Sequence, residues 1–196
     1  MSVVDEKRIL RGTMLAWRGS LSDEERRAAA MGLVEMWRLE RPVQTPAAMS
    51  GAVVSGFWPM AEELDIRPLM IELHNQGCQL CLPVVVAKQQ PLVFRAWRPG
   101  DPLEQGVFGT LHPLPRREVL EPDALIVPLL AVDEEGWRLG YGGGFYDRTI
   151  DGLRARKNIT AVGVGFNAQL IPEVPHGPGD QRLDWLLTDK RACAFV

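Results

Sequence analysis

The sequence DALIVPLLAV at positions 123–132 decides the fold, together with the segments RLGYGGGFYDR at 138–148 and ITAVGVGF at 159–166. The first and third segments are continuous apolar runs, as expected for strands buried on both faces of a sheet. The glycine-rich segment between them leads into a predicted helix over about 145–156. Strands that alternate with helices in this way predict a mostly parallel α/β sheet.

The same alternation continues on both sides of this core. We expect helices at about 5–18, from Ser22 onward and in RPLMIELHNQG (67–77), and strands at about 52–58, 78–86, 91–97 and 185–188. The second helix starts with the capping box S-D-E-E, and Pro42 and Pro46 predict its end and a linker. We therefore predict a single α/β domain over residues 1–196, a mostly parallel sheet flanked by helices.

The loops of this sheet are the places to look for a site, because α/β sheets bind ligands at the carboxyl ends of their strands. The candidate binding loops therefore follow Trp58, Val132 and Phe166. Residues 99–116 contain four prolines and three glycines. That composition predicts an excursion or lid rather than a core element.

Composition limits the class of protein. The chain has 196 residues, of which 46% are hydrophobic and 24% charged, as in soluble globular domains. Its net charge of −3 gives no general attraction to nucleic acid or anionic membranes. Uncharged apolar stretches reach only about ten residues, against ~20 for a membrane span, and the charged start MSVVDEKR differs from a signal peptide. We expect a cytoplasmic protein, a monomer or small homo-oligomer, that binds neither nucleic acid nor membrane.

Cys78 and Cys81 form a C-x-x-C motif, which in other contexts belongs to zinc or redox sites. No second C-x-x-C and no histidine pair follows it. Both cysteines fall in the predicted strand CQLCLPVVV, where residues three apart point to opposite faces. We therefore interpret both as buried packing residues.

The strongest local signal is the glycine-rich loop, in which four of the five positions 140–144 are glycine. Glycines leave backbone N–H groups free to face an anion, and the following helix adds the positive end of its dipole. The loop lacks the Gly-Lys-Ser/Thr of a Walker A motif, and Phe145 replaces the last glycine of the dinucleotide fingerprint. It predicts a phosphate site of another kind; the alternative is a flexible turn.

Two charged clusters fit a phosphorylated ligand. Lys7 and Arg11 lie four residues apart on one helical face, where like charges repel unless an anion binds; the alternative is a solvated basic face. Asp147 opens the helix after the glycine loop, and Asp180 follows the irregular segment PHGPG. Two carboxylates suit the Mg²⁺ of a nucleotide, whereas the alternatives are a helix-dipole residue and a turn residue.

The segment FWPMAEE (57–63) places aromatic side chains near Glu63 at the end of a predicted strand. An aromatic wall beside a carboxylate suits a flat heterocycle with N–H donors; the alternative is a core tryptophan and a solvated glutamate. The histidines are scattered, with no serine or cysteine nucleophile motif near them. A catalytic triad is therefore not expected.

Taken in order, these segments resemble the 5-formyltetrahydrofolate cyclo-ligase family (methenyltetrahydrofolate synthetases) over nearly the whole chain. The resemblance rests on KRILR (7–11), FWPMAEELD (57–65), LVFRAWRPGDPLEQGVFG (92–109), IVPLLAVDEEGWRLGYGGGFYDR (126–148) and VGVGFNAQLIPEVP (162–175). It implies a fold similar to the sugar-phosphate isomerase and CoA-transferase-like α/β class. It also implies an enzyme that uses ATP and Mg²⁺ to cyclise 5-formyltetrahydrofolate, free or polyglutamylated, to 5,10-methenyltetrahydrofolate with release of ADP and phosphate.

The same resemblance implies roles for individual residues. Trp58, Glu63 and Tyr141 would contact the folate, Asp147 and Asp180 would hold Mg²⁺, and Arg138 would act in catalysis. The residues implied in ATP binding are Lys7, Arg8, Ile9, Leu10, Arg11, Arg138, Leu139, Gly140, Tyr141, Gly142, Gly143, Gly144, Phe145 and Tyr146. Two features depart from the family pattern: Phe145 stands where many relatives have tyrosine, and VPHGPGD replaces the more usual acidic-and-histidine lead into the second aspartate.

Two other functions are alternatives. A non-catalytic folate or nucleotide binder on the same fold would not need both a phosphate-binding cluster and Asp147. A sugar-phosphate isomerase would need no ATP and would need a clear acid/base pair.

Overall fold

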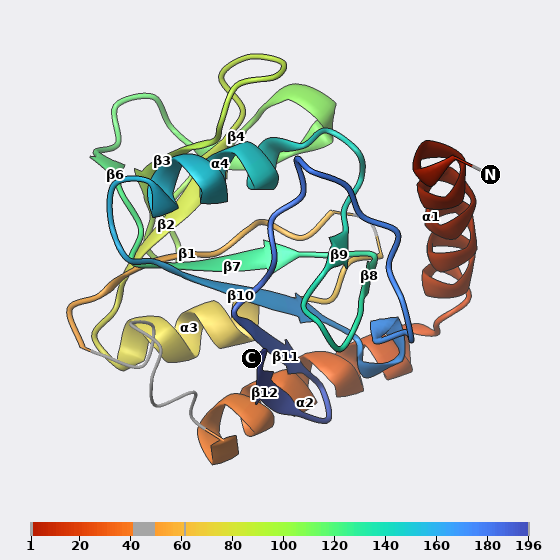
Figure 1. Ribbon diagram of the computed structural model, residues 1–196. Helices are drawn as coiled ribbons and strands as arrows, with labels where there is room; N and C mark the ends of the chain where they lie inside the picture. The colour runs from red at the N-terminus through yellow and green to blue at the C-terminus, as the bar shows by residue number, and fades with distance from the viewer. Residues whose placement is uncertain (1, 41–49, 61, 196) are drawn as a thin grey trace.

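The computed structural model describes residues 2–40, 50–60 and 62–195. Within them, eight strands form one sheet in the order β12-β11-β10-β7-β1-β2-β3-β6 (Figure 1). Five neighbouring strands are parallel: β11 (Trp185–Thr188), β10 (Thr160–Gly165), β7 (Ala124–Pro128), β1 (Val53–Ser55) and β2 (Gln79–Val84). Antiparallel pairing adds the outer strands β12 (Ala192–Ala194), β3 (Val93–Ala96) and β6 (Val119–Leu120). The predicted mostly parallel α/β sheet is confirmed.

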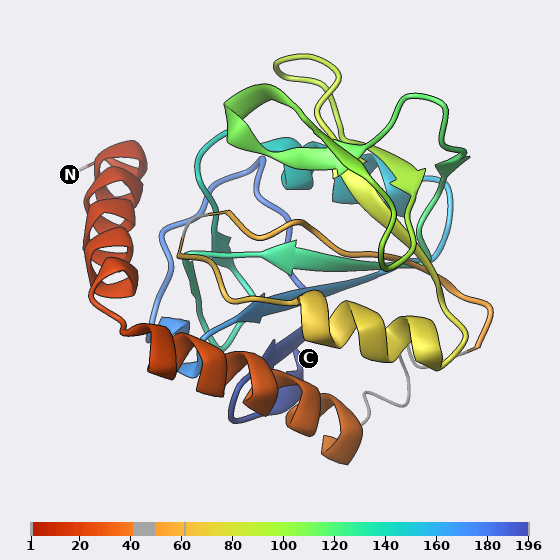
Figure 2. The same cartoon turned by 180° about the vertical axis from the view of Figure 1, so that it is seen from behind.

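Helices cover both faces of this sheet (Figures 1 and 2). α2 (Asp23–Glu40) and α3 (Arg67–Asn75) pack on one face, and α4 (Phe145–Arg154) packs on the other. The apolar residues of α2 recur at helical spacing, so that Leu33 and Trp37 share one buried side. The capping box predicted for α2 is present, because the Ser22 and Glu25 side chains each bond the other's backbone N–H. Pro42 and Pro46 lie outside the described residues.

The two cysteines of the C-x-x-C motif belong to different cores. Cys78 packs on the α2–α3 side and Cys81 on the α4 side. Burial raises the pKa of the Cys81 thiol. Burial of the two cysteines in separate cores confirms the packing interpretation.

The strand predicted over 123–132 is wrong in its second half. β7 ends at Pro128, and β8 (Ala131–Val132) instead pairs with β9 (Arg138–Leu139) in a separate hairpin. Buried Gln169 supplies hydrogen bonds to the backbone at this break. Its side-chain Nε2 donates to the carbonyls of Leu129 and Leu130, each at 2.9 Å. The chain therefore leaves the sheet at the carboxyl end of β7, one hairpin before the glycine loop.

Two other segments are shorter or more ordered than predicted. β1 covers only part of 52–58, because the backbone after Ser55 leaves the sheet and carries Phe57 and Trp58 to a cavity. The proline- and glycine-rich excursion contains a small hairpin of β4 (Leu103–Gln105) and β5 (Leu111–Pro113).

α1 (Val3–Gly19) lies beyond the carboxyl ends of the parallel strands, beside the β8–β9 hairpin (Figure 1). Its Met14 packs with Leu130, Leu139 and Val174 in a small separate core. Because α1 packs mainly in this separate core, it contributes little to the main core and serves mainly the site described next. None of the helices in the described residues has the length and apolar character needed to cross a membrane.

Candidate active site

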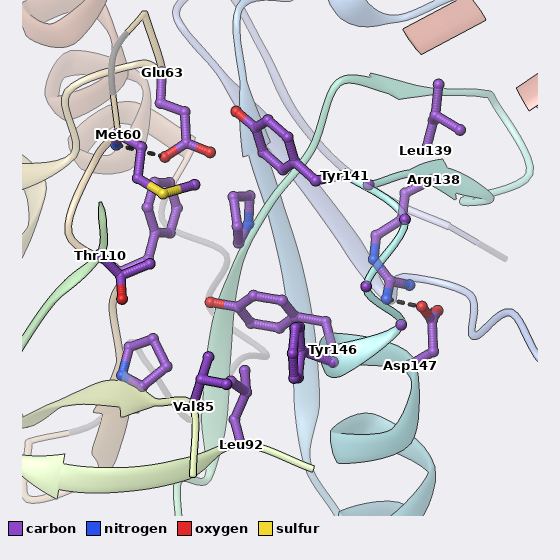
Figure 3. A pocket seen from close by; sticks show the side chains of 18 of the residues that line it. Met60, Glu63, Val85, Leu92, Thr110, Arg138, Leu139, Tyr141, Tyr146 and Asp147 are labelled. Atoms are coloured by element: carbon purple, nitrogen blue, oxygen red, sulfur yellow. Dashed lines mark hydrogen bonds and ion pairs between the residues drawn. The ribbon is translucent and has the colours of Figure 1, made fainter. Parts of the chain in front are cut away.

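A cavity of about 570 Å³ lies at the carboxyl ends of β1, β2 and β7. The sheet order reverses between β1 and β7, because the chain proceeds from β1 to β2 on one side and from β7 to β10 on the other. Ligands of open α/β sheets bind at such a switch point. Figure 3 shows how side chains from separate segments converge on it.

Most of the predicted site residues line this cavity. They are Lys7, Arg11, Trp58, Glu63, Arg138, Leu139, Gly140, Tyr141, Gly142, Gly143, Gly144, Phe145, Tyr146, Asp147 and Asp180. Arg8, Ile9 and Leu10 are not among the lining residues. Arg8 and Ile9 are exposed, and Leu10 packs in the core beneath α1. This division follows from helix geometry, because residues 7 and 11 lie about one turn apart on the face toward the cavity, whereas residues 8 and 9 are rotated away from it.

The glycine loop is fastened to α1 by Arg11. The Nε of Arg11 donates to the Gly140 carbonyl at 2.8 Å. Gly142 has φ +95°, and a Cβ there would lie 3.3 Å from the guanidinium carbon of Arg11, so this position requires glycine. Gly144 is also left-handed, with φ +64°, at the N-terminus of α4. The predicted basic face and phosphate loop are therefore one structural unit.

Two ion pairs form the charged end of the cavity. Lys7 Nζ donates to Asp180 Oδ2 at 2.5 Å, and Arg138 Nη2 donates to Asp147 Oδ1 at 2.7 Å. Arg138 also donates to the backbone carbonyl of Gln181, and the backbone N–H of Gln181 donates to Asp147 Oδ1 at 3.1 Å. These bonds bring together the two aspartates that sequence spacing alone did not connect.

Arg138 is the most deeply buried cation of this end, with 4% of its side chain exposed. Burial lowers its pKa, and the nearby carboxylates of Asp147 and Asp180 oppose that shift. Its guanidinium is therefore a fixed donor group, held by the Asp147 carboxylate and the Gln181 carbonyl. Such a group is suited to stabilise charge that develops on a phosphoryl oxygen.

The two aspartates fit Mg²⁺ in their donor chemistry. Both offer hard carboxylate oxygens, and their side chains are 23% (Asp147) and 21% (Asp180) exposed at the cavity. Within the described ranges no third metal-ligating side chain joins them. Mg²⁺ normally takes one or two carboxylates and completes its shell with phosphate oxygens and water. The donor set therefore fits a metal that enters with a nucleotide.

The other end of the cavity holds a buried carboxylate. Glu63 is 7% exposed, and its Oε2 accepts from the Met60 amide at 2.8 Å (Figure 3). Its Oε1 has no hydrogen-bond partner of ordinary geometry among the described residues. Burial raises the Glu63 pKa, whereas the Met60 amide, the Tyr141 hydroxyl and Arg18 oppose that shift. The carboxylate therefore has unused capacity to accept a hydrogen bond from a ligand.

An aromatic wall accompanies this carboxylate, as the sequence predicts. Trp58 packs edge-to-face on Trp97, with ring centroids 6.0 Å apart, and the Arg67 guanidinium lies 5.5 Å from the Trp58 ring centre. These contacts hold the Trp58 ring in place at the cavity. A flat ligand ring can pack here with its polar edge toward Glu63.

Tyr146 occupies the middle of the cavity, close to Val85 and Leu92 (Figure 3). Its hydroxyl is buried and has no partner in the part of the chain that the structure describes, and burial raises its pKa. The phenol therefore stays protonated and can donate to a ligand. Sequence reasoning placed Tyr146 in the glycine loop but did not foresee this central position.

Sequence reasoning also missed several lining residues. Thr110 and Leu111 reach the cavity from the β4–β5 segment, and Met60, Val85 and Leu92 add apolar surface. The prediction of a lid over 99–116 was the available signal for the first two. The others look like ordinary apolar residues next to strands, so no motif marks them.

The fold and the cavity define a class: an α/β protein whose switch-point pocket joins an anion-binding glycine loop to an aromatic cleft with a buried carboxylate. A sequence model of the 5-formyltetrahydrofolate cyclo-ligase family matches residues 3–189. The chain belongs to this family.

Individual relatives agree with this assignment. The chain is 35% identical over 151 residues to a 5-formyltetrahydrofolate cyclo-ligase of Mycolicibacterium smegmatis, covering 73% of this chain and 76% of the relative. It is 33% identical over 156 residues to the 5-formyltetrahydrofolate cyclo-ligase of Escherichia coli K12, covering 77% and 85%.

Solved structures agree as well. The NMR structure of the Aquifex aeolicus 5,10-methenyltetrahydrofolate synthetase superposes with a TM-score of 0.76 at 28% identity, covering 96% of this chain and 92% of that chain. A 5,10-methenyltetrahydrofolate synthetase from Mycoplasma pneumoniae, at 18% identity and a TM-score of 0.74, covers 94% and 99% and shows the shared fold.

Proposed function

We propose that this protein cyclises 5-formyltetrahydrofolate, free or polyglutamylated, to 5,10-methenyltetrahydrofolate in an Mg²⁺-dependent reaction that converts ATP to ADP and phosphate. Family membership supports the activity. The observation that carries the proposal is one cavity with a cationic, glycine-lined end and a carboxylate-bearing aromatic end. A protein that only bound folate would have no need of the first end.

In the proposed reaction, the formyl oxygen attacks the γ-phosphorus of ATP and ADP leaves. The resulting imidate phosphate is then attacked at its formyl carbon by N10. The carbon–oxygen bond breaks, phosphate departs with the original formyl oxygen, and N10 loses its proton. None of these steps needs a nucleophilic side chain, so the protein acts by positioning the two substrates and by stabilising charge.

At the charged end, Lys7, Arg11 and the amides of the glycine loop would bind the phosphates, and Arg138 would donate to the transferred phosphoryl group. Asp147 and Asp180 would hold Mg²⁺, which would supply charge neutralisation of the phosphates. Arg8 is exposed on the outer face of α1, so a contact with ATP would require its long side chain to reach around the helix.

At the aromatic end, Glu63 would accept hydrogen bonds from the N–H groups of the pterin ring, and Trp58 would pack on the ring. Tyr146 lies between the two ends and would contact the reacting part of the folate. Tyr141 borders both the glycine loop and Glu63. In this proposal the two substrates would lie one after the other along a single cavity.

The test is the absorbance of the methenyl-folate band after the protein is mixed with 5-formyltetrahydrofolate, ATP and Mg²⁺. We expect an increase that requires all three components. Folate binding without any absorbance change would replace the proposal with a non-catalytic binder on the same fold. Absence of both would favour the sugar-phosphate isomerase alternative.

Asp147→Asn provides a second measurement of the metal requirement. We expect the Mg²⁺ concentration for half-maximal rate to rise at least about tenfold, because one hard ligand is lost. Asp151→Asn is the matched control, since Asp151 is an exposed residue of the same helix outside the cavity. Equal Mg²⁺ dependence of the two variants would contradict the assignment of Asp147.

A further inference from the structure

Arg18, in the last turn of α1, is a buried cation whose contacts differ from those of the other buried arginine of the site. It is 2% exposed, and no carboxylate of the described residues lies within ion-pair distance of it. Its Nη2 donates to the Tyr141 hydroxyl, and its guanidinium carbon lies 5.5 Å from the Tyr141 ring centre. Its Nε has no partner in the described chain. A buried charge held in this way needs compensation from nearby negative groups.

Glu63 is the negative group that supplies this compensation. The charge of Arg18 acts on Glu63, where it opposes the effect of burial. The carboxylate is itself buried and keeps one oxygen without a bond of ordinary geometry. The two charges therefore stabilise each other across the Tyr141 side chain rather than in a direct ion pair.

Tyr141 has a defined orientation between them. Because Arg18 donates to its hydroxyl oxygen, the hydroxyl proton points elsewhere. Figure 3 shows the hydroxyl directed toward the Glu63 carboxylate. The order of donors is thus Arg18 to Tyr141, and Tyr141 toward Glu63.

The backbone around these groups is fixed by Arg26. Its Nη2 donates to the Arg18 carbonyl at 2.6 Å and its Nη1 donates to the Glu62 carbonyl at 2.9 Å. The same side chain therefore joins the end of α1 to the residue next to Glu63. This link ties the backbone that carries Arg18 to the backbone next to Glu63.

We propose that Arg18 is a positioning residue for the folate substrate, which acts through Tyr141 to orient the Glu63 carboxylate and to keep it ionised. The proposal rests on the proposed function for the identity of the ligand. Arg18 lies outside the cavity lining, so it acts through the residues that touch the ligand.

The groups that face Glu63 determine how its pKa should respond when Arg18 is replaced. They are the Met60 amide on its own loop, Tyr141 of the glycine loop, Arg18 of α1, and Tyr146 of α4. Arg18 is the cation among them. Without Arg18, less opposes the rise that burial causes in the Glu63 pKa, so Glu63 takes up its proton at a higher pH.

The test compares wild type with Arg18→Met, which keeps the length and apolar packing of the side chain but not its charge. We expect KM for 5-formyltetrahydrofolate to rise about tenfold and the acid limb of kcat/KM to move up by about one pH unit. KM for ATP should stay within about twofold of wild type. Arg18→Lys should restore the acid limb while leaving KM raised, because it keeps the charge and loses the guanidinium geometry.

Controls separate positioning from folding. Arg27→Met changes an exposed arginine of α2 and should match wild type in both measurements. Tyr141→Phe removes only the hydroxyl, so it provides the test if Arg18→Met does not fold; we expect a rise of about threefold in folate KM and a smaller shift of the acid limb in the same direction. A folded Arg18→Met with the wild-type acid limb, or with ATP and folate KM raised equally, would overturn the proposal.

Direct binding distinguishes this proposal from the proposed function. The affinity for 5-formyltetrahydrofolate without ATP is measured from tryptophan fluorescence between pH 5 and 8. If wild type binds but does not turn over, and Arg18→Met shifts the pH dependence of binding, the positioning role stands and the cyclo-ligase function fails. If wild type turns over and Arg18→Met binds with the wild-type pH dependence, the function stands and the positioning role fails.

Discussion

The two ends of the cavity differ in how their polar groups are satisfied before a ligand enters. At the charged end, Lys7 pairs with Asp180 and Arg138 pairs with Asp147. At the aromatic end, Glu63 Oε1 has no hydrogen-bond partner of ordinary geometry among the described residues, and neither has the Tyr146 hydroxyl in the middle of the cavity. The polar groups of the charged end are thus paired with one another, whereas those toward the aromatic end keep hydrogen-bonding capacity for a ligand.

This difference predicts two kinds of binding energetics. A phosphate that binds at the charged end has to replace a carboxylate as the partner of a cation. Its net binding free energy therefore depends on ionic strength and on a metal ion that binds the displaced carboxylates. A ligand at the aromatic end completes bonds to groups that have already lost water, and this gives a full hydrogen-bond gain. We expect selectivity for the folate to come from the aromatic end and turnover from the charged end.

The largest effect is expected where the charged end acts on the reaction. Arg138→Ala should lower turnover by about 10³-fold, because the donor that we propose for the transferred phosphoryl group is lost. Arg154→Ala is the matched control, since Arg154 also pairs with an aspartate, Asp184, but lies away from the cavity. Turnover is measured from the methenyl-folate absorbance, with thermal unfolding as a check on folding. Residual activity above a tenth of wild type would contradict this role.

The aromatic end is tested by Glu63→Gln. Folate KM should rise about 10- to 100-fold, because a charge-assisted acceptor is lost, while ATP KM changes little. A rise in ATP KM of the same size would show that the two ends are not separate in function.

Glu63→Gln should bind the folate more weakly, but its folded state should be more stable than that of the wild type. Burial raises the folded-state pKa of Glu63 above its unfolded value, so ionisation disfavours the folded state at pH values above both. Glu63→Gln should therefore raise the free energy of unfolding at pH 7. The difference should disappear as the pH falls below the unfolded pKa, which urea unfolding between pH 4 and 8 would detect. A variant less stable than wild type at pH 7 would contradict the sign.

A smaller effect compares two neighbouring cations of α1. Lys7 lines the cavity with 16% of its side chain exposed, whereas Arg8 points outward with 75% exposed. Lys7→Ala should raise ATP KM about tenfold, and Arg8→Ala by less than about threefold. The measurement is ATP KM at two salt concentrations, and the Lys7 effect should shrink at high salt. Equal effects would show that ATP contacts both faces of the helix.

The smallest effect is expected at Tyr146→Phe. The buried hydroxyl has no partner among the described residues, so its removal should stabilise the ligand-free protein by about 1 kcal/mol. The added thermal stability on binding 5-formyltetrahydrofolate should decrease, because the hydroxyl no longer bonds the ligand. A variant with unchanged ligand-induced stabilisation would show that this hydroxyl does not serve the folate.

Local patterns predicted the parts of the molecule that depend on nearby residues. The central strands, the Ser22 capping box and the glycine loop follow from apolar runs, short-range hydrogen bonds and backbone freedom, all visible within a few positions. The division of Cys78 and Cys81 between two cores also follows from strand alternation.

The parts that were missed depend on contacts between distant segments. The end of β7 at Pro128 is stabilised by Gln169, about forty positions further along the chain. Arg18 looks like a solvated helix residue until the fold buries it against Tyr141. The pairing of Lys7 with Asp180 was equally absent from any local motif.

The bond between Lys7 and Asp180 joins positions 173 residues apart. During synthesis on a ribosome, α1 emerges long before Asp180, so this contact has to wait for the residues between them. A nascent chain that lacks the segment around Asp180 holds the glycine loop but has only half of the acidic pair. The charged end of the cavity is therefore completed only after Asp180 has emerged, and a chain terminated before that point lacks it.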